Sequence, residues 1–233
     1  MARTLLLDLD GTLVDTVPDL TAALNRLMRS RSLPALTPAQ VTGMIGDGVA
    51  VLVARAFEAL GRCPDPAAVA DFSADYGAHA AVESRLYPNV KAVLHRLERD
   101  GWALAVCTNK PESAARALLD AVGILPLLRA IGGGDSFAVR KPDPAHLLAT
   151  LARVSGSPDR AVMLGDHRND VAAARAAGVA AIFAAWGYGP ASMAHGSAAL
   201  AHDIVEAAGI ADRLLPRDAG QSRRRTASQS YPK

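Results

Sequence analysis

Short apolar runs recur along the chain and are bounded by polar residues, glycine or proline. Runs of this kind are typical of strands that are buried on both faces of a parallel sheet, where polar and apolar positions need not alternate. Four clear runs and one weaker run predict five strands: TLLLDL (4–9), ALAVCT (103–108), AVMLG (161–165), AAIFAA (180–185) and, more weakly, RAIGG (129–133).

Helical periodicity fills most of the intervals between these runs. Apolar residues recur three and four positions apart, and each such stretch ends at a glycine, a common helix terminator. Three stretches follow this pattern: Val90, Val93, Leu94 and Leu97 before Gly101; Leu118, Leu119 and Val122 before Gly123; Leu147, Leu148, Leu151 and Val154 before Gly156. The alternation predicts an α/β fold with a doubly wound parallel sheet, a Rossmann-like core.

One long interval breaks the alternation. Between the first strand and the stretch that begins near residue 88, the chain contains helical signals and no clear strand. Thr37-Pro38-Ala39-Gln40 resembles a capping box with proline at the first helical position. We therefore predict a small helical cap over residues 16–86, a catalytic core formed by 1–15 and 87–215, and a disordered basic tail over 216–233.

Charge and cysteine content narrow the class of protein. The chain has 233 residues and a net charge of +2, but the segment from 217 to the end holds five Lys or Arg and one acid. We expect this tail to be solvated and expect no nucleic-acid or membrane partner, since no apolar run approaches the roughly 20 residues that span a bilayer. Cys63 and Cys107 match no metal-site spacing, which predicts reduced thiols in a cytoplasmic protein. Monomer and homodimer both remain open.

Polar residues gather where the predicted strands end. Asp8 and Asp10 lie at the end of the first run, Thr108, Asn109 and Lys110 at the end of the second, and Asp166 directly after the AVMLG run. In an open parallel sheet the carboxyl ends of the strands lie along one edge, and ligands bind there. Residues about 100 and 160 positions apart should therefore meet at one site.

The residue types at this edge indicate phosphate chemistry. Three carboxylates repel one another unless a hard divalent cation lies among them, and Mg²⁺ is the expected ion for oxygen ligands. Lys141, which follows the weaker strand, and Thr108 would then hold phosphoryl oxygens. An aspartate at such a site can act as nucleophile and form an acyl phosphate.

Four segments carry a family resemblance: DLDGTLVDT, CTNK, RKPDP and GDHRND, in that order. Together they resemble the four motifs of the haloacid-dehalogenase-like hydrolase superfamily, over residues 1 to about 190. The resemblance implies a phosphoric monoester hydrolase with a helical cap. It implies that Asp8 attacks phosphorus, and that Asp10 protonates the leaving alcohol and later activates water.

The resemblance also implies the remaining roles. Mg²⁺ would be bound by the Asp8 carboxylate, the Asp10 backbone carbonyl and Asp166, with Asp170 supporting the metal shell. The phosphoryl group would be held by Thr108, Asn109, Lys141 and the turn at Gly11. The fourth motif departs from the family pattern at His167, where many members have serine, and we interpret this as a neutral substitution.

Within the superfamily, the acid at Asp10 favours a phosphate ester over a halide, because an alcohol leaving group needs a proton. Cap length and the segment MIGDGVAVLVARA resemble the phosphoglycolate phosphatases, which predicts the small ester 2-phosphoglycolate as substrate. Alternatives within the superfamily are a sugar-phosphate phosphatase, a pyrophosphatase and a β-phosphoglucomutase-like mutase. A phospho-receiver signalling module is the non-enzymatic alternative.

Several other features have plainer interpretations. The GGGD segment at 132–135 is expected to be a tight turn, and GDG at 46–48 is either a helix start or a substrate-reading loop. The tryptophans Trp102 and Trp186 are expected to pack rather than bind a ligand. Five histidines show no ligand spacing and are expected at the surface: His79, His95, His146, His195 and His202.

Overall fold

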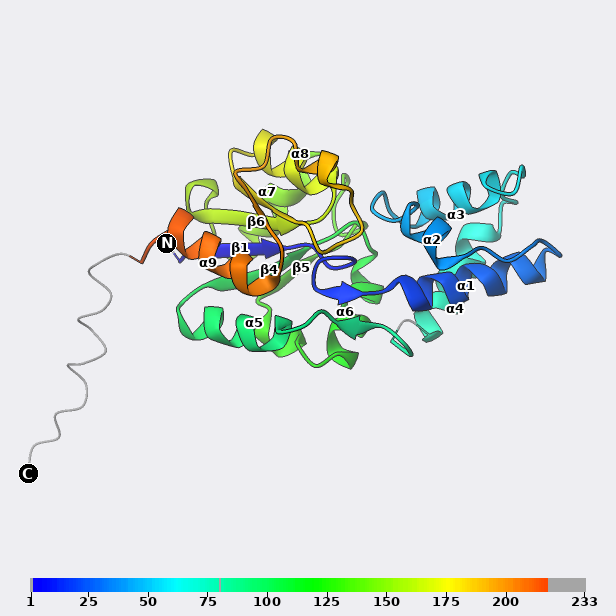
Figure 1. The fold of residues 1–233 in the computed structure, drawn as a ribbon, viewed down its shortest axis with the longest axis horizontal. Coiled ribbons are helices and arrows are strands. Elements are labelled where there is room, and N and C mark those ends of the chain that lie inside the picture. The colour runs from blue at the N-terminus through cyan, green and yellow to red at the C-terminus, as the bar shows by residue number, and fades with distance from the viewer. Residues whose placement is uncertain (1, 80, 218–233) are drawn as a thin grey trace, which may run out of the picture.

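A computed structural model describes residues 2–79 and 81–217 (Figure 1). A six-stranded parallel sheet forms its centre, in the order β5-β4-β1-β6-β7-β8. The strands are β1 (Thr4–Leu7), β4 (Ala103–Cys107), β5 (Ala130–Gly132), β6 (Ala161–Gly165), β7 (Ala180–Ala184) and β8 (Ala199–Ala201). All five predicted strands are present, and the α/β fold with a parallel sheet is confirmed.

Helices cover both faces of this sheet. The first face carries α5 (Val90–Arg99), α6 (Glu112–Ala121) and α9 (Ile204–Leu214), and the second carries α7 (Pro144–Ala152) and α8 (Arg168–Ala176). Leu5 and Leu7 of the central strand pack with the first group, and Leu6 packs with the second. Alternate side chains of one strand thus enter opposite layers, which explains why the strand sequence is apolar throughout.

Four helices lie outside the sheet and share a separate apolar core (Figure 1). They are α1 (Val17–Ser30), α2 (Pro38–Thr42), α3 (Val49–Glu58) and α4 (Ala68–His79). The predicted capping box at α2 is present, since Gln40 N–H donates to the Thr37 hydroxyl and the Thr37 N–H donates back to Gln40. The chain enters this helical unit through β2 (Val14–Asp15) and leaves through β3 (Arg85–Leu86), and these two short strands pair antiparallel.

Some features differ from the sequence-based expectations. No element was predicted for β8, which has three residues, or for α9, which has 11 residues and is rich in alanine. His146 was predicted at the surface, but it is fully buried, because its ring contacts the Gly133 carbonyl at 2.9 Å and the Cys107 sulfur at 3.5 Å. Leu148 was grouped with Leu147 and Leu151 in the apolar pattern of its helix, yet it is exposed.

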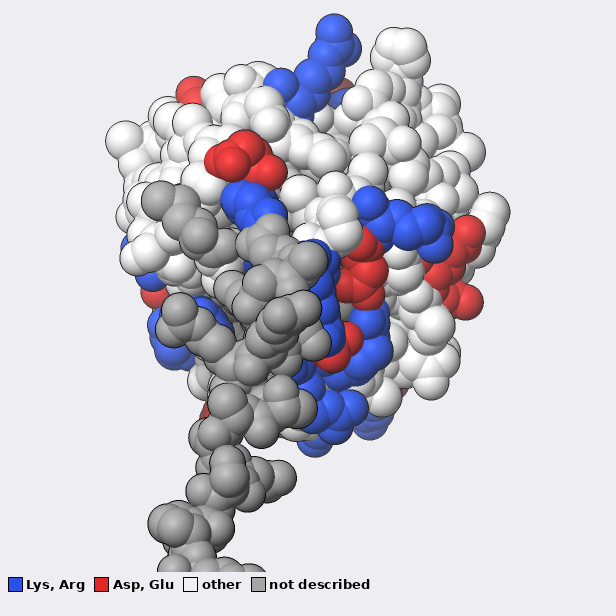
Figure 2. Space-filling model, turned by 90° about the vertical axis from the view of Figure 1, so that its left-hand side faces the viewer, with Lys and Arg blue, Asp and Glu red and all other residues white. Residues whose placement is uncertain are grey.

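Of the predicted basic tail, residues 218–233 lie outside the described part of the chain. Arg217 lies inside it and forms an ion pair with Asp100. On this end of the molecule, shown in Figure 2, positive and negative side chains lie beside one another. Within the described ranges, none of the helices is both long and apolar enough to cross a membrane.

Candidate functional site at the sheet edge

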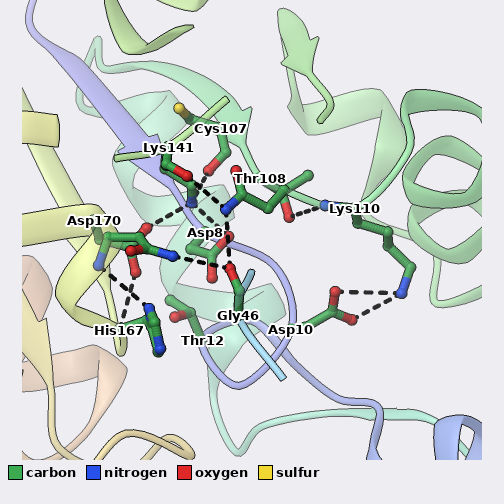
Figure 3. Close-up of polar contacts among 12 residues, drawn as sticks. Asp8, Asp10, Thr12, Gly46, Cys107, Thr108, Lys110, Lys141, His167 and Asp170 are labelled. Atoms are coloured by element: carbon green, nitrogen blue, oxygen red, sulfur yellow. Dashed lines mark hydrogen bonds and ion pairs between the residues drawn. The ribbon is translucent and has the colours of Figure 1, made fainter. Parts of the chain in front are cut away.

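The carboxyl ends of three neighbouring strands meet at one place (Figure 3). Strand β1 pairs with β4 on one side and with β6 on the other, so the residues that follow these strands are adjacent. Carboxylate oxygens of Asp8, Asp166 and Asp170 all lie within 4.8 Å of one another, and all three residues are buried. The structure therefore brings together acids that are about 160 positions apart in the sequence.

Lys141 contacts two members of this acidic group. Its ammonium donates to Asp8 Oδ1 at 2.8 Å, to Asp170 Oδ1 at 2.5 Å and to the carbonyl of Cys107 at 2.5 Å. Burial lowers the pKa of Lys141, but the charges of Asp170 and Asp8 raise it more, so it lies above its ordinary value. Lys141 is therefore a charged group that fixes two of the three acids.

Asp166 is held by neutral donors. The Thr12 hydroxyl donates to Oδ1 at 3.0 Å, and the backbone N–H groups of Tyr188 and Gly189 donate to Oδ2 at 2.7 and 3.4 Å. Burial, followed by the charges of Asp8 and Asp170, raises the pKa of Asp166 to about 8. Burial is also the main cause at Asp8, where it outweighs the favourable charge of Lys141 and raises the pKa to about 6.

These acids fit a divalent cation. Asp8 and Asp170 share the ammonium of Lys141, whereas Asp166 has neutral donors, so the three carboxylates carry more negative charge than the one cation balances. Carboxylate oxygens at this spacing are the donor set that Mg²⁺ prefers. The chemistry of the donors therefore supports a bound metal between Asp8 and Asp166.

Asp10 belongs to a second cluster. Its side chain points away from Asp8 and toward Lys110, whose ammonium lies 2.9 Å from Oδ1 and 3.3 Å from Oδ2 (Figure 3). The hydroxyl of Thr16 donates to Asp10 at 2.8 Å. Lys110 also contacts the hydroxyl of Tyr76 on helix α4 at 2.8 Å. A core lysine thus joins the second predicted catalytic acid to the helical unit.

A loop of the helical unit also touches the core. The Gly46 carbonyl accepts hydrogen bonds from the side-chain amides of Asn109 at 2.9 Å and Asn169 at 3.2 Å. Asp47 accepts from Asn169 at 2.7 Å and pairs with Arg55 at 2.6 Å. The GDG segment is therefore a loop that rests on the site, and its last residue, Gly48, is the N-cap of α3.

Two glycines allow close approach at this interface. Gly11 has φ +84°, and a Cβ there would lie 2.4 Å from Asp166 Oδ2. Gly46 has φ +119°, and a Cβ there would lie 2.8 Å from the ring of His167. Both positions need glycine for backbone conformation and for space.

A cavity of about 530 Å³ lies between the helical unit and the sheet edge. Its floor is polar and is formed by residues that follow the strands: Asp8, Asp10, Thr108, Asn109, Lys110 and Asp166. Its far wall is mainly apolar and comes from the helical unit. A ligand in this cavity would face the acidic group on one side and the helices on the other.

The remaining predicted residues lie near this floor with defined partners. Asn109 donates to the carbonyls of Gly46 and Lys141, both at 2.9 Å, so both of its amide hydrogens are already used. The Gly11 N–H donates to the Val14 carbonyl at 2.9 Å, so this N–H does not face a phosphate. Gly11 instead makes the predicted tight turn.

His167 serves the start of helix α8. The ring Nδ1 of His167 accepts a hydrogen bond from the backbone N–H of Asn169 at 3.3 Å. The backbone N–H of His167 donates to Asp170 Oδ2 at 3.0 Å, which completes a capping box. Burial, together with the smaller effects of Arg168 and Lys141, outweighs the negative charges of Asp47 and Asp8 and lowers the pKa of this imidazole. A neutral histidine can accept this bond as the usual capping residues do.

Sequence reasoning missed several contributors to the site. Tyr76 belongs to a helix whose orientation relative to the core no local pattern reveals. Tyr188 follows β7, and its N–H and hydroxyl hold Asp166 and Asp15. The available signal for Tyr188 was position, because it comes shortly after the predicted strand AAIFAA.

Comparison with known proteins agrees with this geometry. A family model of haloacid dehalogenase-like hydrolases matches residues 2–178. A phosphoglycolate phosphatase of Rhodospirillum rubrum is 43% identical over 196 residues, which cover 81% of each chain. That of Caulobacter vibrioides is 44% identical over 189 residues, covering 79% of this chain and 80% of the relative.

A solved structure extends the likeness to the whole fold. The crystal structure of a predicted phosphoglycolate phosphatase from Haemophilus somnus superimposes with a TM-score of 0.81 at 32% identity, covering 91% of this chain and 96% of that one. The match includes the helical unit as well as the sheet, because it spans nearly all of both chains. This chain therefore belongs to the haloacid dehalogenase-like hydrolase family.

Proposed function

We propose that this protein is a Mg²⁺-dependent phosphatase that hydrolyses 2-phosphoglycolate through an aspartyl-phosphate intermediate on Asp8. The observation that carries the proposal is the group of Asp8, Asp166 and Asp170, two of which pair with Lys141, beside a cavity of about 530 Å³. The relatives named phosphoglycolate phosphatase, at 43 and 44% identity, support the choice of substrate.

Asp8, Asp166 and the Asp10 carbonyl would hold the metal, and Asp170 would support it through Lys141. When bound, Mg²⁺ neutralises charge on the phosphoryl oxygens and orients the phosphorus toward Asp8. Lys141 and the Thr108 hydroxyl lie at the same edge and would bind other oxygens of that group. Asn109 and the turn at Gly11 complete this pocket by fixing the backbone around it.

In the first step, a carboxylate oxygen of Asp8 attacks phosphorus as the bond from phosphorus to the ester oxygen breaks. Asp10 transfers its proton to that oxygen, and glycolate leaves. Lys141 keeps the Asp8 carboxylate in position through the 2.8 Å contact to Oδ1. The product of this step is a phosphoryl group bonded to Asp8.

In the second step, Asp10 removes a proton from a water molecule, which attacks the phosphorus of the acyl phosphate. The bond from phosphorus to Asp8 breaks, phosphate leaves, and the carboxylate of Asp8 is restored. One residue acts as acid and then as base, as general acid–base catalysis in two half-reactions requires.

The same proposal assigns residues 16–86 to a cap that closes over the cavity and excludes water, on a core of 1–15 and 87–215. The cavity wall supports this assignment, because it combines residues of α1, α3 and α4 with residues of the sheet edge. The free cysteines Cys63 and Cys107 are compatible with the cytoplasmic location that we propose.

A panel of phosphate esters tests the function. We expect 2-phosphoglycolate to give the highest kcat/KM among 2-phosphoglycolate, pyrophosphate, glucose 6-phosphate and β-glucose 1-phosphate, and we expect EDTA to abolish turnover. Asp8→Asn should be inactive, while Asp19→Asn, a buried acid of the helical unit, should retain activity. A different preferred ester would refute the substrate, and a stably phosphorylated protein without turnover would favour a receiver module.

A further inference from the structure

The charges that line the cavity are distributed unevenly. The residues that the helical unit contributes to its wall include Leu20, Ile45, Val49, Leu52, Phe72 and Tyr76, and none of its described lining residues is charged. The core contributes three acids: Asp8, Asp10 and Asp166. Among the described residues that line the cavity, Lys110 is the one with an ammonium or guanidinium group.

This distribution matters for a substrate with two anionic ends. The phosphate of 2-phosphoglycolate has partners at the edge that holds Asp8 and Lys141. Its carboxylate needs a partner of its own, because an unpaired charge in a largely apolar cavity is costly. The described lining residues of the helical unit include no cation, so a cationic partner must come from the core.

Lys110 has the geometry for this contact. It is buried, with 6% of its surface exposed, and it comes directly after Asn109 at the end of β4. An ammonium carries three N–H donors. Its three contacts go to Oδ1 and Oδ2 of Asp10, at 2.9 and 3.3 Å, and to the Tyr76 hydroxyl at 2.8 Å. A substrate carboxylate would take the place of the longer contact to Asp10 and leave the other two intact.

The shape of the substrate adds a second constraint. In 2-phosphoglycolate a single CH₂ separates the carboxylate from the ester oxygen that must accept a proton. Lys110 contacts the carboxylate of Asp10 directly, at 2.9 Å (Figure 3). A substrate carboxylate bound to the same ammonium would therefore place the ester oxygen beside Asp10.

We propose that Lys110 is a specificity-determining residue that binds the carboxylate of the substrate and so selects phosphate esters of 2-hydroxy acids. The inference rests on the proposed phosphatase function and assigns to the core, rather than to the cap, the recognition of leaving-group charge. Tyr76 orients the lysine through its hydroxyl.

The test compares two substrates on the same enzyme preparation. 2-Hydroxyethyl phosphate has the shape of 2-phosphoglycolate but a neutral alcohol in place of the carboxylate. The ratio of kcat/KM for the two esters is independent of the fraction of folded enzyme. We expect Lys110→Met to lower this ratio about tenfold to a hundredfold, the range for a hydrogen bond between charged groups.

Two further variants serve as controls. Lys110→Arg keeps the charge and should retain most of the ratio. Tyr76→Phe removes the hydroxyl that orients the lysine but leaves the ammonium and its contact with Asp10, so it should lower the ratio less than Lys110→Met does. An equal loss on both esters in Lys110→Met would show that Lys110 only positions Asp10, and it would overturn the proposal.

The outcomes also separate this inference from the function on which it rests. A wild type that prefers 2-phosphoglycolate, with the same preference in Lys110→Met, overturns the role of Lys110 alone. A wild type that turns over both esters equally, or neither, overturns the proposed substrate and the inference with it.

Discussion

Asp8→Asn should stabilise the metal-free protein even though it abolishes activity. Burial, outweighing the favourable charge of Lys141, raises the pKa of Asp8 from 3.8 to about 6. Because this folded-state pKa lies above the unfolded value, ionisation of Asp8 costs stability as pH rises from about 4 through 6. At 1.36 kcal/mol for each pKa unit, the cost above pH 7 is about 3 kcal/mol.

Asparagine removes this cost because it is neutral at all of these pH values. The substitution also removes the charge of Asp8, which helps to raise the pKa of Asp166. The ionised form of Asp166 then costs less stability, an effect in the same direction. In EDTA at pH 8 we therefore expect Asp8→Asn to unfold about 6 to 12 °C above the wild type. At pH 4, where the wild-type carboxyl is protonated, the difference should nearly vanish.

Thermal unfolding followed by circular dichroism, with EDTA at pH 4 and pH 8, measures the effect. Asp19→Asn is the matched control, because Asp19 is buried and accepts hydrogen bonds from the N–H groups of Glu83 and Ser84. This control should lose stability at pH 8. If Asp8→Asn also unfolds below the wild type in EDTA at pH 8, the account of uncompensated charge at the site is wrong.

Three further perturbations have definite outcomes. Gly46→Ala places a Cβ against the ring of His167 at φ +119°, so kcat/KM should fall while urea unfolding of the core changes little. Asp212→Ala removes the acceptor of the buried Trp102 indole and a partner of Arg3, which should cost about 1–3 kcal/mol in urea unfolding. Arg96 and that indole hold the pKa of Asp212 low despite its partial burial, so the contribution of Asp212 to stability should decline as pH falls below 4. Mg²⁺ should raise the Tm of the wild type more than that of Asp8→Asn, as differential scanning fluorimetry would show.

The fold was predictable from the sequence where burial and parallel strand topology determine it. The run Thr4–Leu7 is apolar at every position because both faces of β1 are covered, and this pattern identifies a central parallel strand. The meeting of Asp8 with Asp166 follows from parallel topology alone, because strand ends share one edge. Neither inference needed side-chain detail.

Other features depend on how separate units pack, and local sequence does not encode that. The contact of Lys110 with Tyr76 requires the orientation of a helix from the cap. His146 is buried because the Gly133 carbonyl and the Cys107 sulfur are hydrogen-bond partners for its ring nitrogens. The usual surface preference of histidine does not predict such partners. Strand β8 has three residues, too few for a periodic signal.

The antiparallel pair of β2 and β3 has an evolutionary consequence. The two chain segments that connect the units lie side by side as this pair of strands, so the helical unit is joined to the core through one short neck, β2 and β3. A different set of helices could be exchanged at this neck without altering the register of any sheet strand. If leaving-group charge is sensed by the core, as argued for Lys110, such an exchange would remodel the tolerated size and shape of a substrate and preserve the preference for acidic esters.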